Sequence, residues 1–346
     1  MQSHNGTPIR VNFFQRKPRA VGNYSVEFIF KDVRRQLGGL IESEEIFSSY
    51  ESSGLLKRIY NCIEAAAKQG KVNHITGDIN YIGLFLNKRK TIQTVLDCVH
   101  LSSSTGIKHA ILKLFWVTIP VKRAKYVTAI SQSTKNEILK YVNCDPDKIK
   151  VVHVAISEKF SRRDKQFYAK NPRILQLGTA PNKNIPRLIE ALEGIPCILD
   201  IVGRHDEVLE EALKKHSISY EYSWALSDEQ ILQKYIQADI VSLVSTYEGF
   251  GMPILEAQAT GRPVITSNIL SMPEVAGDAA CIVDPYSIQS IREGFEKIIG
   301  DTAYRENLIE KGFENVKRFN PHDIAMQYFE LYKSISSQNE CADLLV

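Results

Sequence analysis

Two glutamates, Glu248 and Glu256, are separated by seven residues in the segment EGFGMPILEA, and a short glycine-containing loop lies between them. A buried strand is expected before this loop, and Pro253 is a typical first residue of the helix expected after it. Gly249 and Gly251 would let the backbone approach a ligand, and the helix start would offer free N–H groups and a positive dipole end. The pattern therefore predicts a cradle for a phosphate or diphosphate group.

The two carboxylates suggest what is attached to those phosphates. Glu256, one turn into the helix, is stabilised as an anion by the dipole and could accept hydrogen bonds from the two hydroxyls of a ribose. Glu248 would lie near the other end of the diphosphate, so a nucleotide-diphosphate sugar fits both residues. A helix cap with two surface glutamates is the alternative. The loop misses the dinucleotide pattern GxGxxG because Ile254 stands at the third glycine position, which argues against a nicotinamide dehydrogenase.

Short apolar runs alternate with helix-length amphipathic segments along the whole chain of 346 residues. Strands are expected at Val11–Phe14, His74–Thr76, Thr91–Leu96, Tyr126–Ile130 and Lys150–Val154 in the first half, and at Arg173–Leu177, Cys197–Val202, Ile240–Val244, Val264–Thr266 and Cys281–Val283 in the second. This alternation predicts an α/β protein with two doubly wound parallel sheets, each with its ligand site at the carboxyl ends of its strands.

The charged segment Ile156–Asn171 separates the two halves and is expected to be the linker. We expect an N-terminal domain at residues 1–157 and a C-terminal domain at 158–321. A last helix at 322–336 is expected to pack back on the first domain. Residues 1–160 hold 24 Lys and Arg against 13 Asp and Glu, a net of +11, and the remainder of the chain is acidic. Halves of opposite charge favour different partners for the two domains.

Composition narrows the class of protein. The chain is 44% hydrophobic and 24% charged, which excludes a disordered chain, and the basic residues carry no nucleic-acid-binding signature. An anionic membrane surface or an anionic lipid-linked substrate is the better candidate partner for the basic half. The alternative is that the basic residues only keep that half soluble. Six cysteines without zinc-binding spacing, together with a polar start, favour a cytoplasmic protein, with the inner membrane surface as an expected place of contact. Asp145-Pro146-Asp147 matches a metal-binding D-x-D pattern but is expected to be a turn.

The residues around the two glutamates resemble retaining glycosyltransferase family 4, whose signature is E-x7-E. The stretch GRPVITSNILSMPEVAGDAACIVDP and the upstream LGTAPNKNIPRLIEAL are similar to that family as well. The resemblance is strong from about Arg173 to Arg318. It implies a GT-B fold, in which two Rossmann-like domains face each other across a cleft.

The resemblance also implies roles for individual residues. Lys183 would bind the donor diphosphate and stabilise the charge that develops as the sugar bond breaks, and Glu248 would orient the donor sugar. Gly22 would belong to a glycine loop of the first domain that faces the diphosphate. The implied donor-binding residues are Gly22, Gly178, Lys183, Glu248, Gly249, Phe250, Gly251, Met252 and Glu256. Lys183 and Glu248 are the implied catalytic residues.

The expected function is therefore the transfer of a hexose from UDP- or GDP-hexose to a hydroxyl of a glycan or lipid-linked acceptor, in cell-surface polysaccharide synthesis. The implied mechanism retains the anomeric configuration and uses no metal and no cofactor. Thr179, Asn182 and Leu96 depart from the family's usual residues. They leave open a weakened relative that only binds nucleotide sugar, and a sugar-nucleotide epimerase of similar architecture is a further alternative.

Overall fold

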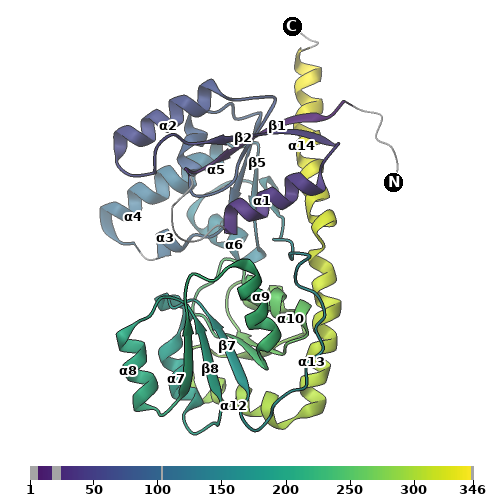
Figure 1. Cartoon of the computed structure of the whole chain (residues 1–346). Helices are drawn as coiled ribbons and strands as arrows, with labels where there is room; N and C mark the ends of the chain where they lie inside the picture. The colour runs from purple at the N-terminus through teal and green to yellow at the C-terminus, as the bar shows by residue number, and fades with distance from the viewer. Residues whose placement is uncertain (1–6, 18–24, 103, 344–346) are drawn as a thin grey trace. The chain divides into compact units, whose positions relative to one another are not determined.

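The chain divides into two units of contacting residues, Met1–Ala155 with Pro321–Val346, and Ile156–Asn320. The computed structural model describes residues 7–17, 25–102 and 104–343 (Figure 1). The unit boundaries fall within two residues of the expected domain limits at 157 and 321. No helix among the described residues is long and apolar enough to cross a membrane.

The first unit is built on a parallel sheet of six strands in the order β2-β1-β3-β4-β5-β6. Its strands are β1 (Ile9–Gln15), β2 (Ile41–Phe47), β3 (Val72–Ile75), β4 (Thr91–Val95), β5 (Tyr126–Ala129) and β6 (Ile149–Val151). Its helices are α1 (Ser25–Gln36), α2 (Leu55–Ala67), α3 (Val99–Ser102), α4 (Gly106–Leu112), α5 (Ile119–Arg123), α6 (Gln132–Tyr141) and α14 (Pro321–Asp343). Short segments η1 (Asn80–Leu84), η2 (Lys113–Thr118) and η3 (Pro146–Lys148) connect them.

The second unit has the strand order β12-β11-β10-β7-β8-β9, again all parallel. Its strands are β7 (Arg173–Leu177), β8 (Ile198–Val202), β9 (Ser219–Ser223), β10 (Ile240–Leu243), β11 (Val264–Ser267) and β12 (Cys281–Val283). Its helices are α7 (Ile185–Leu192), α8 (Glu207–Lys215), α9 (Asp228–Gln237), α10 (Met252–Thr260), α11 (Met272–Ala276), α12 (Ile288–Gly300) and α13 (Thr302–Asn315), with short turns η4 (Pro181–Lys183) and η5 (Val316–Phe319).

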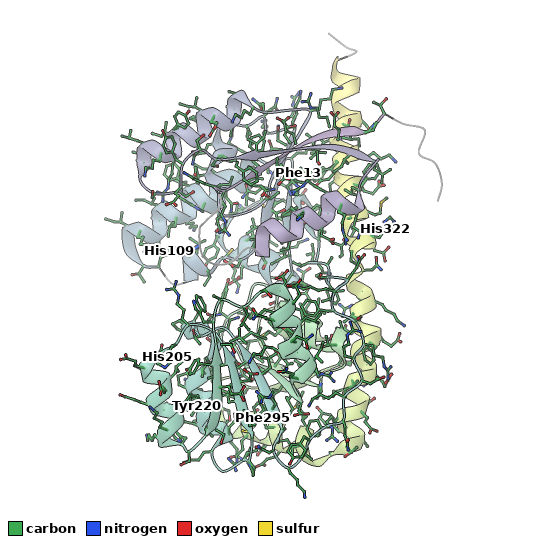
Figure 2. The ribbon with its side chains drawn as sticks, viewed as in Figure 1. Phe13, His109, His205, Tyr220, Phe295 and His322 are labelled. Atoms are coloured by element: carbon green, nitrogen blue, oxygen red, sulfur yellow. The ribbon has the colours of Figure 1, made fainter. Side chains whose placement is uncertain are left out.

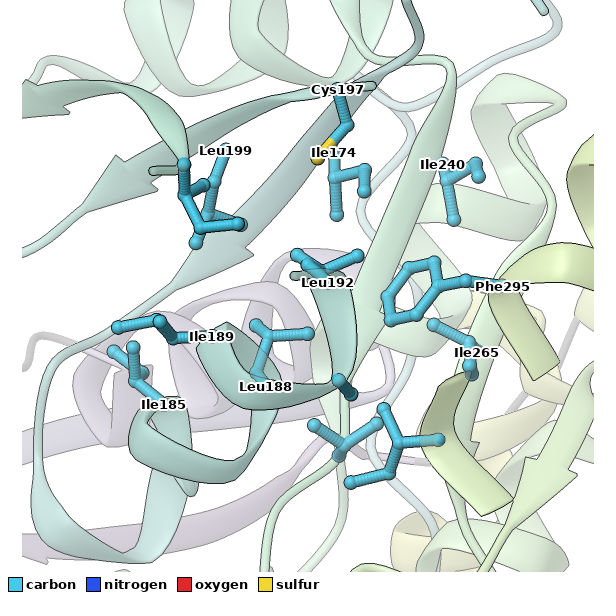
Figure 3. Close-up of a cluster of buried hydrophobic side chains, with 14 of the residues drawn as sticks. Ile174, Ile185, Leu188, Ile189, Leu192, Cys197, Leu199, Ile240, Ile265 and Phe295 are labelled. Atoms are coloured by element: carbon cyan, nitrogen blue, oxygen red, sulfur yellow. The ribbon is translucent and has the colours of Figure 1, made fainter. Parts of the chain in front are cut away.

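In each unit, helices pack apolar side chains against the sheet and complete the hydrophobic core. In the second unit, α7 turns Ile185, Leu188, Ile189 and Leu192 toward the sheet, at the spacing of one helix face (Figure 3). Phe295 of α12, labelled in Figure 2, enters the same cluster.

In the first unit, α14 packs its Tyr328 and Tyr332 against Phe13 and Phe30. The C-terminal helix therefore belongs to the first unit. It extends to Asp343, beyond the expected end at residue 336.

Two expectations about secondary structure were incomplete. Each sheet has six strands, whereas five were expected in each half; the additional strands, β2 and β9, both lie at sheet edges. The sequence pattern from Ile107 to Ile119 predicts one continuous helix, whereas the structure divides this segment into α4, a π-helical segment η2 and α5.

Candidate functional site

The strand order of the second unit determines where a ligand can bind. From β7 the chain winds outward through β8 and β9 and then returns to β10 on the other side of β7. The crossovers leave in opposite directions from this point, so a crevice is expected beyond the carboxyl ends of β7 and β10. The loop after β7 carries Gly178 to Asn184, and the loop after β10 carries Ser245 to Gly251.

These loops bring the two expected catalytic side chains into contact. The Lys183 Nζ lies 2.6 Å from Oε1 of Glu248, and both side chains are largely buried. Ser245 donates its hydroxyl to the same carboxylate oxygen at 2.7 Å. A buried carboxylate held by an ammonium and a hydroxyl is fixed in orientation, and the ammonium is available for a second anion on its other side.

The two loops are also joined through their main chains. Asn182 donates its side-chain amide to the carbonyl of Tyr247 at 2.9 Å, and Thr246 N–H donates to the carbonyl of Asn182 at 2.8 Å. Asn182 was identified in the sequence as a departure from the family pattern; here it holds the loop of Lys183 against the loop of Glu248.

Asn184 directly follows Lys183 in the chain and anchors this loop to neighbouring loops. It has a left-handed backbone with φ of +59°, and its buried side-chain amide donates to the carbonyls of Val244 and Pro285 at 3.0 and 2.7 Å. These two bonds compensate the cost of a left-handed conformation in a residue that is not glycine. Sequence reasoning missed Asn184, although an asparagine before Ile-Pro is a recognisable helix-start signal.

Position 178 favours glycine for two reasons, its backbone conformation and the nearby Lys183 side chain. Its φ is +84°, and a Cβ atom placed there would lie 3.0 Å from Cε of Lys183. The lysine side chain therefore crosses directly over this glycine. Backbone conformation and side-chain space therefore both disfavour a larger residue, which would strain the backbone and displace the Lys183 side chain.

The start of α10 has the geometry expected for an anion cradle. Gly251 occupies the N-cap position with φ of +108°, and Pro253 lies in the first turn. Because the N-cap residue is a glycine, no N-cap side chain covers the first amides of the helix. Met252 is the first residue of α10, whereas the side chain of Phe250 is buried and packs edge-on against Phe319, with ring centroids 5.8 Å apart. Phe250 can thus contribute only its main chain to a ligand.

Glu256 lies farther along α10 and has a different partner. The hydroxyl of Tyr235, on α9, donates a short hydrogen bond to its Oε2 atom. Burial raises the pKa of Glu256 above its ordinary value, and the Tyr235 bond opposes that shift. Tyr235 is fully buried, and burial raises its own pKa well above 10. No sequence pattern indicates this pair, because its members lie on different helices.

The first unit has its own reversal of winding, between β1 and β3. Arg16 follows β1 and Asp78 follows β3, and their side chains form an ion pair at 2.6 Å. Asp78 also lines a cavity of about 260 Å³ at the carboxyl ends of β3 and β4. Other residues of its lining are Arg58, Asn80, Asp97, His100 and Trp116. Gly22, expected in this region, lies outside the described residues.

Two polar atoms at this cavity lack a partner. Arg58 Nε and Asn80 Oδ1 are both buried without a hydrogen bond within the described part of the chain. Buried polar groups are normally paired, so these atoms are suited to a polar ligand. His74, by contrast, is buried between Tyr332 and Thr94, with hydrogen bonds of 2.8 Å to each, and burial lowers its pKa to about 3. It is a structural residue.

The structure thus brings Lys183, Glu248 and Gly178 together and places Gly251 and Met252 at the start of the helix that follows Glu248. Sequence reasoning did not identify Ser245 or Tyr235, which fix the two glutamates.

Comparison with known proteins agrees with this geometry. Residues 157–315, nearly the whole of the second unit, match the family model described as glycosyl transferases group 1. The O-antigen chain mannosyltransferase B of Escherichia coli is 29% identical over 231 residues, which cover 61% of this chain and 61% of that protein. The matched region thus spans about three fifths of that relative.

Solved structures share the fold over almost the entire chain. A glycosyltransferase from Rickettsia africae superposes with a TM-score of 0.74 and 19% identity, covering 95% of this chain and 99% of the other. Anabaena Alr3699/HepE, solved in complex with UDP and glucose, superposes with a TM-score of 0.74 and 15% identity, covering 94% of this chain and 100% of the other. The protein therefore has the GT-B fold, and its second unit is a group 1 glycosyltransferase domain.

Proposed function

We propose that the protein transfers a hexose from a nucleotide-diphosphate sugar to a hydroxyl group of a glycan or lipid-linked acceptor. The observation that carries this proposal is the contact between Lys183 and Glu248, at the reversal of winding in the second unit and just before the uncapped start of α10. A cation, an oriented carboxylate and main-chain amides at a helix start are the groups that a sugar diphosphate needs.

The donor would lie along the loops after β7 and β10. Lys183 and the amides of Gly249 to Met252 would hold the diphosphate, Glu248 would accept hydrogen bonds from the sugar, and Glu256 would accept them from the ribose. UDP-hexose and GDP-hexose are the candidate donors. Anabaena HepE, which shares the fold, was solved with UDP, and this favours UDP as the first nucleotide to test.

The proposed reaction retains the anomeric configuration and requires no metal. The bond between the anomeric carbon and the diphosphate oxygen breaks, and the acceptor oxygen bonds to the same face of that carbon. The departing diphosphate takes the acceptor's proton. Lys183 would stabilise the negative charge on the leaving group, which supports a reaction without a divalent cation. Glu248 would orient the sugar and stabilise positive charge at the anomeric carbon.

The acceptor would bind to the first unit, in the cavity lined by Arg58, Asp97 and His100. The Escherichia coli relative is named an O-antigen chain mannosyltransferase, which supports a role in cell-surface polysaccharide synthesis and a mannosyl group as the first hexose to test. We place the reaction in the cytoplasm, at the inner membrane surface, because Cys62, Cys98, Cys197 and Cys281 are buried free thiols and the first half of the chain is basic.

Thermal unfolding of the full chain with UDP, GDP and ADP, each with and without EDTA, tests the donor site. A nucleotide present at 100 times its dissociation constant adds about 2.7 kcal/mol of stability. The nucleotide with the correct base should therefore raise the unfolding temperature most. A stabilisation that EDTA abolishes contradicts a metal-independent site. Transfer to a sugar acceptor, followed by NMR of the anomeric proton, then tests retention. An inverted product contradicts the mechanism, and an epimerised nucleotide sugar contradicts transfer itself.

A further inference from the structure

The outer face of α2 is apolar, which is unusual for a helix on a protein surface. Its inner face packs Asn61, Cys62 and Ala65 against the first unit. The outward side chains are large and hydrophobic, and Leu56 is 82% exposed. Together with Leu56 they are Leu55, Ile59, Tyr60 and Ile63, which follow one another at helical spacing. A surface helix normally presents polar residues to water.

A second apolar stripe runs along α4 and η2. Ile107, Ile111, Leu114 and Phe115 are exposed, and their spacing places them on one side of the helical segment. Ile107 is 81% exposed. Nine of the 18 large hydrophobic side chains that the described residues expose lie on α2, α4 and η2. Single exposed apolar residues are ordinary, but a concentration of this kind marks an interaction surface.

The two stripes belong to one surface. The guanidinium of Arg58, on α2, lies over the ring of Trp116, on η2, at 4.6 Å from its centroid. Tyr81 packs against the same ring at 5.2 Å. In Figure 1, α2 and α4 lie one beside the other along the left side of the first unit. We call the exposed residues of α2, α4 and η2 the apolar face.

The charge around the apolar face is positive. Lys57, Lys108 and Lys113 lie on its helices. From Cys98 to Asn136 the chain contains six Lys and Arg residues and no Asp or Glu. The acidic residue of α2, Glu64, is paired with Lys68 at 2.9 Å.

We propose that the apolar face docks the protein on an anionic lipid bilayer. Helices that lie in a bilayer interface combine exposed large apolar side chains with flanking cations, and each cation near an anionic surface strengthens binding. A second copy of this chain is a poorer occupant, because pairing the face with itself would bring its lysines against one another. The lipid headgroups supply the negative charge that the face lacks.

This inference deepens the proposed function and depends on it only for the identity of the acceptor. Arg58 and Trp116, which join the two stripes, also line the cavity of the first unit, as does Leu112 at the end of α4. A bilayer on the apolar face would therefore lie next to the cavity. A lipid-linked saccharide could enter the cavity with its chain still in the membrane.

The test is flotation of the full chain with vesicles of phosphatidylglycerol and phosphatidylcholine in equal parts, or of phosphatidylcholine alone. We expect binding to the anionic vesicles, weakening as salt is raised, and little binding to the neutral ones. Leu56→Glu together with Ile107→Glu should lower the partition coefficient by about tenfold or more. Both side chains are exposed and support no core contact, so the variant should fold. Val208→Glu, at a 75% exposed residue of α8 in the second unit, is the matched control and should bind like the wild type.

Three results would overturn the proposal. The first is wild-type protein that does not bind anionic vesicles at low salt. The second is a loss of vesicle binding in Val208→Glu equal to that in the double variant. The third is light scattering that shows a dimer in the wild type and a monomer in the double variant. The nucleotide-dependent thermal shift of the same variants is measured separately. Vesicle binding that fails while UDP still stabilises the protein refutes the docking surface alone, and the reverse result refutes the donor site alone.

Discussion

The ammonium group of Lys183 lies 2.6 Å from the carboxylate of Glu248, although 65 positions separate the two residues in the chain. Each neutralises the other where both are largely buried, so neither charge is left uncompensated before a donor binds. A diphosphate arriving at Lys183 would share the ammonium with Glu248 and fix the carboxylate beside the sugar. In the proposed reaction, the pair would thus serve both ends of the bond that breaks.

Replacing either member of the pair should slow catalysis. We expect Lys183→Ala and Glu248→Ala each to lower kcat at least tenfold, which is about 1.4 kcal/mol of transition-state stabilisation. Because the residues act through one contact, the double variant should lose less than the product of the two effects. Initial rates of sugar transfer measure this. Lys170→Ala, at an exposed lysine of the same unit, should leave the rate unchanged. Near-normal rates for both single variants would remove the catalytic assignment.

Gly178 should be required for the position of Lys183 rather than for folding alone. Gly178→Ala introduces a Cβ 3.0 Å from Lys183 Cε at φ of +84°, whereas Gly194→Ala introduces one at φ of +77° with no atom within 4 Å. Both variants should lose about 1 kcal/mol of stability from the same backbone strain. We expect only Gly178→Ala to raise the Kd for the nucleoside diphosphate, by about fivefold or more for a displacement that weakens one charged contact. Equal affinities in the two variants would show that the Lys183 position tolerates the added methyl group.

Ten of the twelve strands could be predicted from the sequence, and most of these are runs of buried, largely apolar residues. The two that were missed lie at sheet edges. In β2 the sequence IESEEIF exposes five of its seven residues, and in β9 the sequence SYEYS has no fully buried residue. Hydrophobic periodicity detects burial, whereas these strands form through main-chain hydrogen bonds to β1 and β8. Tertiary pairing decided their structure.

The candidate site shows the same division. Spacing and resemblance could identify Glu248, Glu256 and Lys183 as residues of interest. They could not predict that Glu256 bonds to Tyr235, because that contact depends on how α9 packs against α10. The role of Asn182 could not be predicted either. In the sequence it only differs from the family's usual residue, whereas in the structure its side chain joins the two loops by a hydrogen bond to Tyr247.

Tyr235 should matter for donor affinity through Glu256. Tyr235→Phe removes the hydroxyl that holds the carboxylate. We expect the Kd for the nucleoside diphosphate to rise about threefold to tenfold, because the carboxylate is no longer held in place before the ribose binds. Stability should fall by about 1 kcal/mol, since the half-buried Glu256 loses a hydrogen-bond partner. Isothermal titration and urea unfolding measure the two effects.

Tyr222→Phe is the matched control for that variant. The Tyr222 hydroxyl is buried and has no hydrogen-bond partner among the described residues, so its removal should be neutral or stabilising. If both tyrosine variants changed affinity alike, the effect would come from general loosening of the unit, and the positioning role of Tyr235 would be refuted.

The burial of His74 should give the first unit an acid-sensitive stability. Burial lowers the pKa of His74 to about 3 from its ordinary 6.5. Between pH 3 and pH 6.5, therefore, His74 is protonated in the unfolded chain and neutral in the folded protein. The stability that His74 contributes is therefore complete above pH 6.5 and is lost as the pH falls toward 3. From pH 6.5 to pH 5 the loss should reach about 2 kcal/mol.

Urea unfolding at pH 7 and pH 5 can isolate this effect. The chain has two tryptophans, Trp116 in the first unit and Trp224 in the second, so a Trp224→Phe background makes fluorescence report the first unit alone. In that background His74→Gln should abolish the extra loss at pH 5, while changes from carboxylates cancel in the comparison with the parent. Parallel stability changes in parent and variant would mean that His74 accepts a proton within the fold, despite its burial between Tyr332 and Thr94.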